Sequence, residues 1–144
     1  MSNLFGSLKR LALIYSIVLL IALAHVFRLG SYLQGEWYNL YYSYFSDIVI
    51  PFGFYFLVCS NETFIPFLRH WPVKLAITFL TPAIAETCQY FGIALLGVTF
   101  DPLDYAMYAV GASSAVLVDT LVFSRLFRFW PIKKAAGQAA YRKD

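Results

Sequence analysis

The chain has 144 residues, of which 60% are hydrophobic and 13% are charged, and its formal net charge is +3. A mean hydropathy of +0.65 is too high for a soluble globular protein, and the length leaves no room for a second domain. The basic residues form no motif typical of nucleic-acid binding, so we expect no nucleic-acid partner. We therefore expect one domain, residues 1–144, that lies in a membrane.

Four long apolar runs predict four membrane-spanning helices, at about residues 10–28, 44–60, 73–97 and 104–125. Each run is close to the ~20 residues that an α-helix needs to cross ~30 Å of hydrocarbon. The first run has no small-residue cleavage site, which favours a retained span over a signal peptide. The predicted fold is all-α, an integral membrane four-helix bundle with a short basic C-terminal tail.

The positions of the lysines and arginines predict the orientation of this bundle. If both termini are cytoplasmic, ten of the eleven basic residues lie on the cytoplasmic side, and Arg28 alone lies outside. Cytoplasmic loops of membrane proteins carry an excess of Lys and Arg. We therefore expect a multi-pass protein of the cell membrane with cytoplasmic N and C termini, surrounded by membrane lipids. The sequence leaves both a monomer and a homo-oligomer open.

Aromatic residues precede the second span. Tyr38, Tyr41, Tyr42 and Phe45 follow one another at helical spacing, and such rings favour the headgroup level of a bilayer. The sequence therefore predicts a helix that begins well before the hydrocarbon.

The two cysteines are expected to be unpaired. Cys59 is predicted at the inner end of the second span and Cys88 within the third, so their sulfur atoms should lie far apart. We interpret both as small buried residues.

Two acidic residues within the spans are predicted at the same depth. Glu86 lies twelve residues after Lys74, and Asp47 lies twelve residues before Cys59, so each is ~18 Å above the inner boundary. An ionisable group at the centre of a span costs ~2.5 kcal/mol or more on insertion scales. The coincidence of depth therefore indicates a site in the outer half of the bundle.

Polar and small residues follow one face of each of the last three spans. The faces are Asn39, Ser43, Ser46 and Asp47; Glu86, Gln89 and Tyr90; and Asp104, Tyr108, Gly111, Ala112, Ala115 and Asp119. We expect these faces to meet at the bundle axis, with close helix approach at the small residues. Asp119 is expected to be structural, because it lies near enough to the inner boundary to meet Arg69, Lys74 or water.

The loop before the fourth span combines capping residues with candidate ligands. Asp101 is a suitable N-cap, Pro102 suits the first helical turn, and the helix dipole favours a carboxylate at Asp104. Helix capping and ligand binding are both open interpretations of these two aspartates.

Several of these residues also form a family-like pattern. Glu86-x-x-Gln89, the turn Gly97-x-Thr99-Phe100-Asp101-Pro102-Leu103-Asp104, and then Tyr108 and Gly111 resemble the signature of the VanZ-like family of small membrane proteins, and Asp47 followed by Pro51-Phe52-Gly53 resembles its second-span pattern. The resemblance covers roughly Asp47 to Gly111. It implies a multi-pass cell-membrane protein of a family associated with glycopeptide-antibiotic resistance. The family often has an arginine between the glutamine and the aspartates, and this chain has none there.

The leading functional hypothesis is that the acidic residues bind an envelope lipid or a cell-wall precursor. The candidate binding residues are Asp47, Glu86, Gln89, Asp101, Asp104 and Tyr108. Carboxylates and a phenol suit sugar hydroxyls or a cationic group, whereas a phosphate would need an intervening divalent metal. We expect no resident metal and no cofactor.

Three alternatives remain from the sequence. A buried Glu86 could carry protons in a small proton-coupled transporter. A membrane hydrolase has the least support, because no Ser–His pair is predicted, His25 and His70 are expected on opposite sides, and no catalytic residue can be named. The polar residues could instead only pack the bundle, with each interhelical hydrogen bond contributing ~0.6 kcal/mol.

Overall fold

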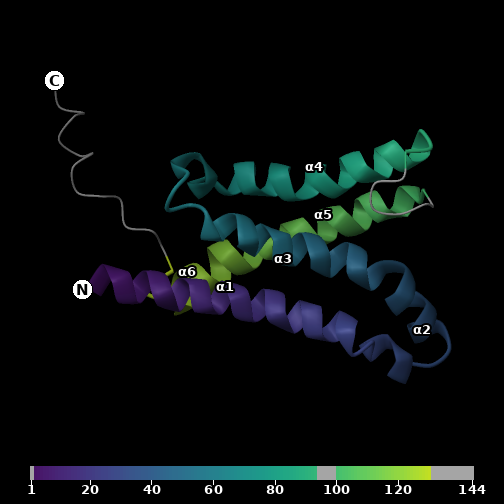
Figure 1. Ribbon diagram of the computed structural model, residues 1–144, viewed down its shortest axis with the longest axis horizontal. Helices are drawn as coiled ribbons and strands as arrows, with labels where there is room; N and C mark the ends of the chain where they lie inside the picture. Colours follow the sequence, from purple (N-terminus) through teal and green to yellow (C-terminus); the bar gives the residue numbers. More distant parts are fainter. Residues whose placement is uncertain (1, 94–99, 131–144) are drawn as a thin grey trace.

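In a computed structural model that describes residues 2–93 and 100–130, the chain is helical, and no strand occurs in these ranges. Four long helices lie side by side (Figure 1). The first is α1 (Ser2–Val26), and the third is α4 (Trp71–Tyr90). The second is continuous and consists of α2 (Glu36–Leu40), the π-helical turn η2 (Tyr41–Phe45) and α3 (Ser46–Ser60). The fourth consists of α5 (Pro102–Leu117), the π-helical turn η4 (Val118–Phe123) and α6 (Ser124–Leu126). Short 3-10 helices, η1 (Leu29–Tyr32) and η3 (Pro66–Arg69), lie in the connections.

The long helices alternate in direction, so the bundle has two distinct ends (Figure 1). The N-terminal end holds the start of α1, the end of α3, the start of α4 and helix α6. The opposite end holds the end of α1, helix α2, the end of α4 and the start of α5. The basic tail, residues 131–144, lies outside the described residues.

Three of these helices are long and apolar enough to cross a membrane: Leu4–Val26, Glu36–Ser60 and Pro102–Leu126. The first and second begin earlier than the runs predicted at 10–28 and 44–60. For the second, this confirms the prediction that the helix starts before the hydrocarbon.

Helix α4 differs from the other three long helices. Its 20 residues span about 30 Å, but it is not among the helices apolar enough to count as a candidate span. Its sequence contains several polar residues, and three of them, Lys74, Thr78 and Glu86, are buried. It ends at Tyr90, and Gly92 adopts the left-handed region just beyond it, with φ of 78°. Residues 94–97 of the third predicted span lie outside the described residues.

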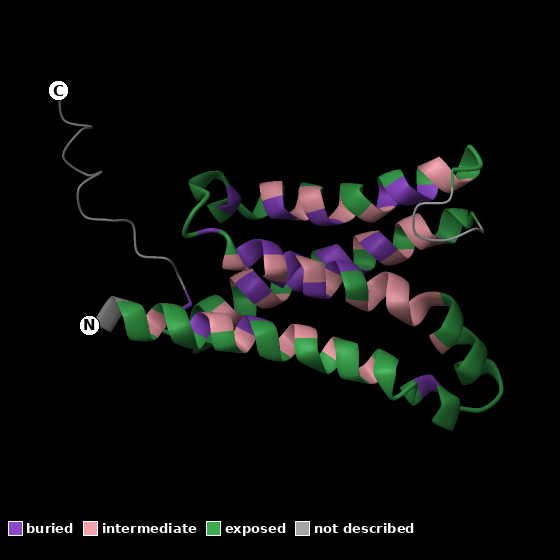
Figure 2. Cartoon of the chain, viewed as in Figure 1, coloured by how far each residue is buried: buried purple, intermediate pink, exposed green. Residues whose placement is uncertain are grey.

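Helix α3 lies at the centre of the bundle and packs against α1, α4 and α5. Buried residues gather where α3, α4 and α5 face one another, whereas α1 is largely exposed (Figure 2). The hydrophobic core is formed by Ile14, Tyr55, Phe56, Cys59, Ala115 and Trp130. Many large apolar side chains remain exposed, including Leu19, Leu20 and Leu23 along α1, and such a surface suits a lipid environment.

Helices α3 and α5 approach each other closely at Gly111 on α5. A Cβ built there would lie 2.0 Å from the backbone oxygen of Ile48 on α3. Its neighbours on the predicted face, Tyr108, Ala112 and Ala115, are also buried. The inward-facing stripe predicted for the fourth span, with its small central residues, is confirmed.

The other two predicted stripes are only partly correct. Asn39 and Ser43 are exposed, although Asp47 is half-buried. Every residue of α2 is exposed, so this first part of the helix has no buried face that Asn39 could share with Asp47. Tyr90, the last residue of α4, is 66% exposed and therefore does not share the buried face of Glu86.

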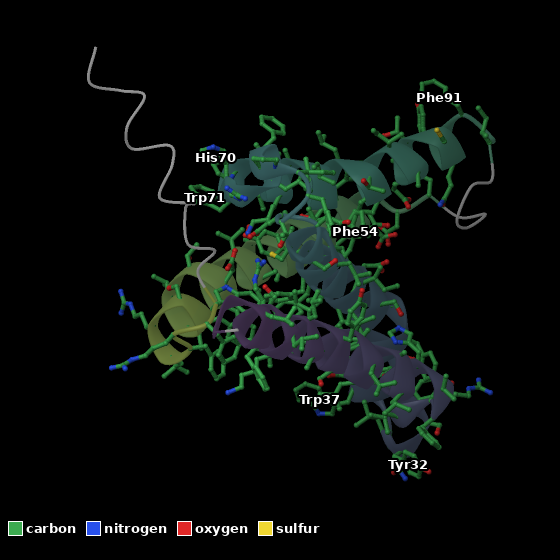
Figure 3. The ribbon with its side chains drawn as sticks, turned by 60° about the vertical axis from the view of Figure 1, so that its left-hand side comes forward. Tyr32, Trp37, Phe54, His70, Trp71 and Phe91 are labelled. Atoms are coloured by element: carbon green, nitrogen blue, oxygen red, sulfur yellow. The ribbon has the colours of Figure 1, made fainter. Side chains whose placement is uncertain are left out.

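The connection between α1 and α2 presents aromatic rings on the outside of the bundle. Tyr32 is 81% exposed and Trp37 is 71% exposed, and both side chains lie away from α4 in Figure 3. Tyr41 packs inward instead, with its ring over Gly30, where an added Cβ would lie 2.1 Å from the ring. Tyr41 is thus packed against the α1–α2 connection, whereas Tyr32 and Trp37 are exposed on the outside of the bundle.

Candidate functional site

Four charged residues form a buried cluster at the N-terminal end, which we call the paired-charge cluster. Arg10 comes from α1, Glu62 from the loop after α3, Lys74 from the first turn of α4, and Asp119 from η4. All four are at least nine-tenths buried. Glu62 binds Arg10 Nη2 through Oε2 at 2.6 Å and Lys74 Nζ through Oε1 at 2.5 Å, and Lys74 Nζ also lies 2.6 Å from Asp119 Oδ2.

Neutral groups add further hydrogen bonds to this cluster. Asp119 accepts hydrogen bonds from the Tyr55 hydroxyl at 2.7 Å and from the Trp130 indole Nε1–H at 2.6 Å. Lys74 Nζ donates to Cys59 Sγ at 3.3 Å. The predicted contact of Asp119 with a basic residue is confirmed, with Lys74 as the partner.

The sequence did not predict the other members of the cluster. For Asp119 the sequence predicts Arg69, Lys74 or water as a partner, and it indicates no partner for Arg10, Glu62 or Trp130. No periodicity marks Glu62, since it lies after the end of α3. The one available signal was that Arg10, Glu62, Lys74 and Asp119 all fall near one boundary of the predicted bundle.

The positive charges of this cluster match its negative charges. Arg10 and Lys74 stand against Glu62 and Asp119, so the formal sum is zero. Ligand atoms of Cys59, Glu62 and Asp119 lie within 4.8 Å of one another, as in a metal site. The Lys74 ammonium contacts all three residues, and it supplies there the positive charge that a metal ion would bring.

A second cluster lies at the opposite end and consists of Asp47, Glu86, Asp101 and Asp104, which we call the acidic cluster. Glu86 is 2% exposed. Its Oε1 accepts a hydrogen bond from the backbone N–H of Asp101 at 2.8 Å, and its Oε2 accepts a long one from the Tyr108 hydroxyl at 3.4 Å. The side chain of Asp101 caps α5 by accepting from the Leu103 N–H at 2.9 Å, which confirms the predicted capping role.

The carboxyl groups of the acidic cluster also interact electrostatically with one another. Asp47 interacts electrostatically with Glu86 and Asp101, and Asp104 interacts with all three of the others. Within residues 2–93 and 100–130, no hydrogen-bond donor or basic side chain contacts the carboxyl group of Asp47 or Asp104. Unlike the paired-charge cluster, this cluster therefore has a formal charge of −4 and no cation among the described residues.

No protein-family model, no curated protein and no solved structure matches this chain. Its function is therefore inferred from the contacts, burial and charges of its own residues.

Most of the residues predicted to form the site are brought together. Asp47, Glu86, Asp104 and Tyr108 interact electrostatically from three different helices, as expected from the polar faces predicted to meet at the bundle axis. Gln89 lies one turn after Glu86 on α4 and is half-buried. The predicted turn residues 97–99 lie outside the described residues.

The prediction that no serine pairs with a histidine is wrong. His25 on α1 contacts Ser46 on α3, with 3.0 Å between Nε2 and Oγ, and its Nδ1 lies 2.8 Å from the Ile21 carbonyl oxygen. Because that carbonyl can only accept, Nδ1 carries a hydrogen and donates it to the Ile21 carbonyl oxygen. The contact joins α1 to α3, which is the bundle hydrogen bond expected of a lone histidine. Cys59 and Cys88 are both free thiols, as predicted.

Proposed function

We propose that this chain is a multi-pass protein of the cell membrane with four spans and cytoplasmic N and C termini. Its basic side chains support this orientation. Lys9, Arg10, Arg69, Lys74, Arg125 and Arg128 all belong to the N-terminal end, whereas Arg28 lies at the opposite end. Cytoplasmic ends carry the excess of Lys and Arg, so the acidic cluster would lie in the outer half of the membrane. Polar side chains of α4 are buried against protein, whereas Leu80 and Ile84 on the same helix are exposed, which suits a span with one protein-facing and one lipid-facing side.

This orientation can be tested by thiol labelling in intact cells. In a Cys59→Ser/Cys88→Ser background, Leu33→Cys places a thiol at the exposed α1–α2 connection and Ser7→Cys places one near the start of α1. A membrane-impermeant maleimide is expected to label the first variant in intact cells and the second only after permeabilisation. The reverse pattern would contradict cytoplasmic termini.

We infer further that the acidic cluster binds the ammonium group of an envelope lipid or cell-wall precursor from the outer leaflet. The observation that carries this proposal is the charge imbalance between the two clusters of one bundle. Buried charges are normally paired, and the paired-charge cluster follows that rule. A cationic group of a ligand would provide the missing partner for Asp47 and Asp104.

The neighbouring contacts favour a ligand over simple packing. Glu86 is already held by the Asp101 amide and the Tyr108 hydroxyl, so its carboxylate is fixed in place before any ligand arrives. The carboxyl groups of Asp47 and Asp104 are half-buried and have no donor within the described residues. The fixed carboxylate of Glu86 lies beside the carboxyl groups of Asp47 and Asp104, which have no donor among the described residues. This arrangement suits a compact ammonium group, which offers three donors.

Two phospholipids that differ in the headgroup test the proposal. Phosphatidylethanolamine carries an ammonium group, and phosphatidylglycerol carries the same phosphate with hydroxyls instead. In mixed micelles, the first lipid at a hundredfold excess over its dissociation constant should raise the free energy of unfolding by about 2.7 kcal/mol. The second lipid should have no comparable effect.

Variants separate the acidic cluster from general lipid effects. Asp47→Asn/Asp104→Asn should abolish the stabilisation by phosphatidylethanolamine, while Glu36→Gln, an exposed carboxylate on the same continuous helix as Asp47, should keep it. Equal stabilisation of all three proteins, or by both lipids, would contradict the proposal.

The proton-coupled transporter remains the second candidate, favoured by the burial of Glu86. A proton would neutralise part of the acidic cluster in place of a ligand. Proton uptake by proteoliposomes that requires Glu86, with no response to phosphatidylethanolamine, would favour this reading.

A further inference from the structure

A cysteine and a lysine face each other inside the paired-charge cluster. Cys59 lies in the last turn of α3, and Lys74 lies in the first turn of α4. Their Sγ and Nζ atoms are 3.3 Å apart, and the residues are 0% and 3% exposed. The contact joins the two helices on either side of the loop that carries Glu62.

We propose that Cys59 and Lys74 are a redox modification site at which dioxygen forms a covalent nitrogen–oxygen–sulfur bridge between the two side chains. One oxygen atom becomes the bridge, bonded to both Nζ and Sγ, and the other leaves as water. The nitrogen and the sulfur each give up two electrons, which together reduce one dioxygen molecule. This site is independent of the acidic cluster and of the ligand proposed for it.

The protons of this reaction also have a defined destination. The ammonium of Lys74 has three hydrogens and the thiol has one; one stays on the bridged nitrogen, two leave in water, and one must be taken up by a base. Glu62 Oε1 and Asp119 Oδ2 lie 2.5 Å and 2.6 Å from Nζ, so either carboxylate can accept that proton. The cluster loses one positive and one negative charge together and stays neutral, which avoids leaving an uncompensated buried charge.

The surroundings select this product over ordinary cysteine oxidation. Cys88 is also a free thiol, and an intramolecular disulfide with it is not formed. Dioxygen is small and apolar and dissolves in hydrocarbon, so it can reach a thiol that charged oxidants cannot. Successive oxidation of a thiol to sulfenic and sulfinic acids would place new polar atoms in the core, whereas the adjacent Nζ diverts the oxidised sulfur into a bridge.

A bridge would also change how the N-terminal end is held together. It would tie α3 covalently to α4 and remove the ammonium that links Glu62 to Asp119. Asp119 would keep only the neutral donors Tyr55 and Trp130. Oxidation is therefore expected to replace the ionic link from α4 to Glu62 and Asp119 with a covalent link between α3 and α4.

The test uses the full chain with Cys88→Ser, which leaves Cys59 as the single thiol. Protein purified without oxygen should show one reactive thiol after denaturation. After exposure to air, this thiol should disappear, and the intact mass should show the gain of one oxygen atom and the loss of two hydrogen atoms. Dithiothreitol added to the denatured protein should restore both the thiol and the original mass.

Two further measurements keep the proposal falsifiable. Peptide mapping of the air-exposed protein should recover a cross-linked pair containing Cys59 and Lys74, which needs no additional substitution. Lys74→Arg in the same background keeps the positive charge and should retain the thiol or gain oxygen without losing hydrogen. A thiol that persists in air, an oxygen gain without hydrogen loss in the Lys74 protein, or a disulfide-linked dimer would each overturn the bridge.

Discussion

Replacing Lys74 with methionine should destabilise the protein by about 3–5 kcal/mol, because removing one partner of a buried ion pair leaves an uncompensated charge. Lys74 is the common partner of Glu62 and Asp119. Without it, Arg10 still pairs with Glu62, but Asp119 retains no cation among the described residues. Unfolding of Lys74→Met in mixed micelles measures this loss directly.

Arg69→Gln provides the matched control for a basic residue at the same end. Arg69 Nε donates only to the backbone oxygen of Glu62, at 3.1 Å, so its replacement should cost about 1.5 kcal/mol or less. Adding Asp119→Asn to Lys74→Met should recover part of the lost stability, because it removes the charge left unpaired. If Lys74→Met lowered the free energy of unfolding no more than Arg69→Gln does, the paired-charge cluster would not be the main stabilising contact at this end.

Gly111→Ala is expected to cost about 3 kcal/mol or more, because the new methyl group would meet backbone and not a flexible side chain. Its Cβ would lie 2.0 Å from the oxygen and 2.9 Å from the carbonyl carbon of Ile48. Helices α3 and α5 would have to separate. Since Tyr108 and Asp104 lie on the same helix near this contact, the acidic cluster would be displaced as well.

Gly53→Ala is the control for a second buried glycine. The nearest atom to its added Cβ is the terminal Cδ1 of Ile21, at 2.8 Å, and this flexible side chain can move. The expected cost is about 1 kcal/mol, and the thermal unfolding midpoints of the two variants make the comparison. Equal losses for Gly111→Ala and Gly53→Ala would show that α3 and α5 tolerate separation.

The parts of the fold that follow from periodicity were predictable from the sequence. Apolar runs predicted the approximate positions of the helices. The spacing of Tyr108, Ala112 and Ala115 predicted the buried face of α5. The depths of Asp47 and Glu86 depend only on the rise per residue, so their approach across two helices could also be anticipated.

The remaining features depend on contacts that no periodic pattern encodes. Every residue of α2 is exposed, so Asn39 does not share a buried face with Asp47, and Ser43 in η2 is exposed as well. Glu62 lies in a loop, and only the packed structure brings it to Arg10 and Lys74. The contact of His25 with Ser46 likewise depends on how α1 lies against α3.

The two clusters suggest a division of roles along the bundle. At the N-terminal end every buried charge of the paired-charge cluster has a partner of opposite sign, which suits a structural lock. At the opposite end four carboxyl groups meet without a cation in the described part of the chain. An unbalanced cluster is costly in a membrane, and a bound cationic group would offset that cost.

Native mass spectrometry of the protein purified with its own lipids tests this central proposal most directly. The wild type and Glu36→Gln should each retain a bound lipid or precursor that carries an ammonium group, and Asp47→Asn/Asp104→Asn should lose it while remaining folded. Retention of the same bound molecules by all three proteins, or retention only of lipids that lack a cationic group, would contradict the proposal.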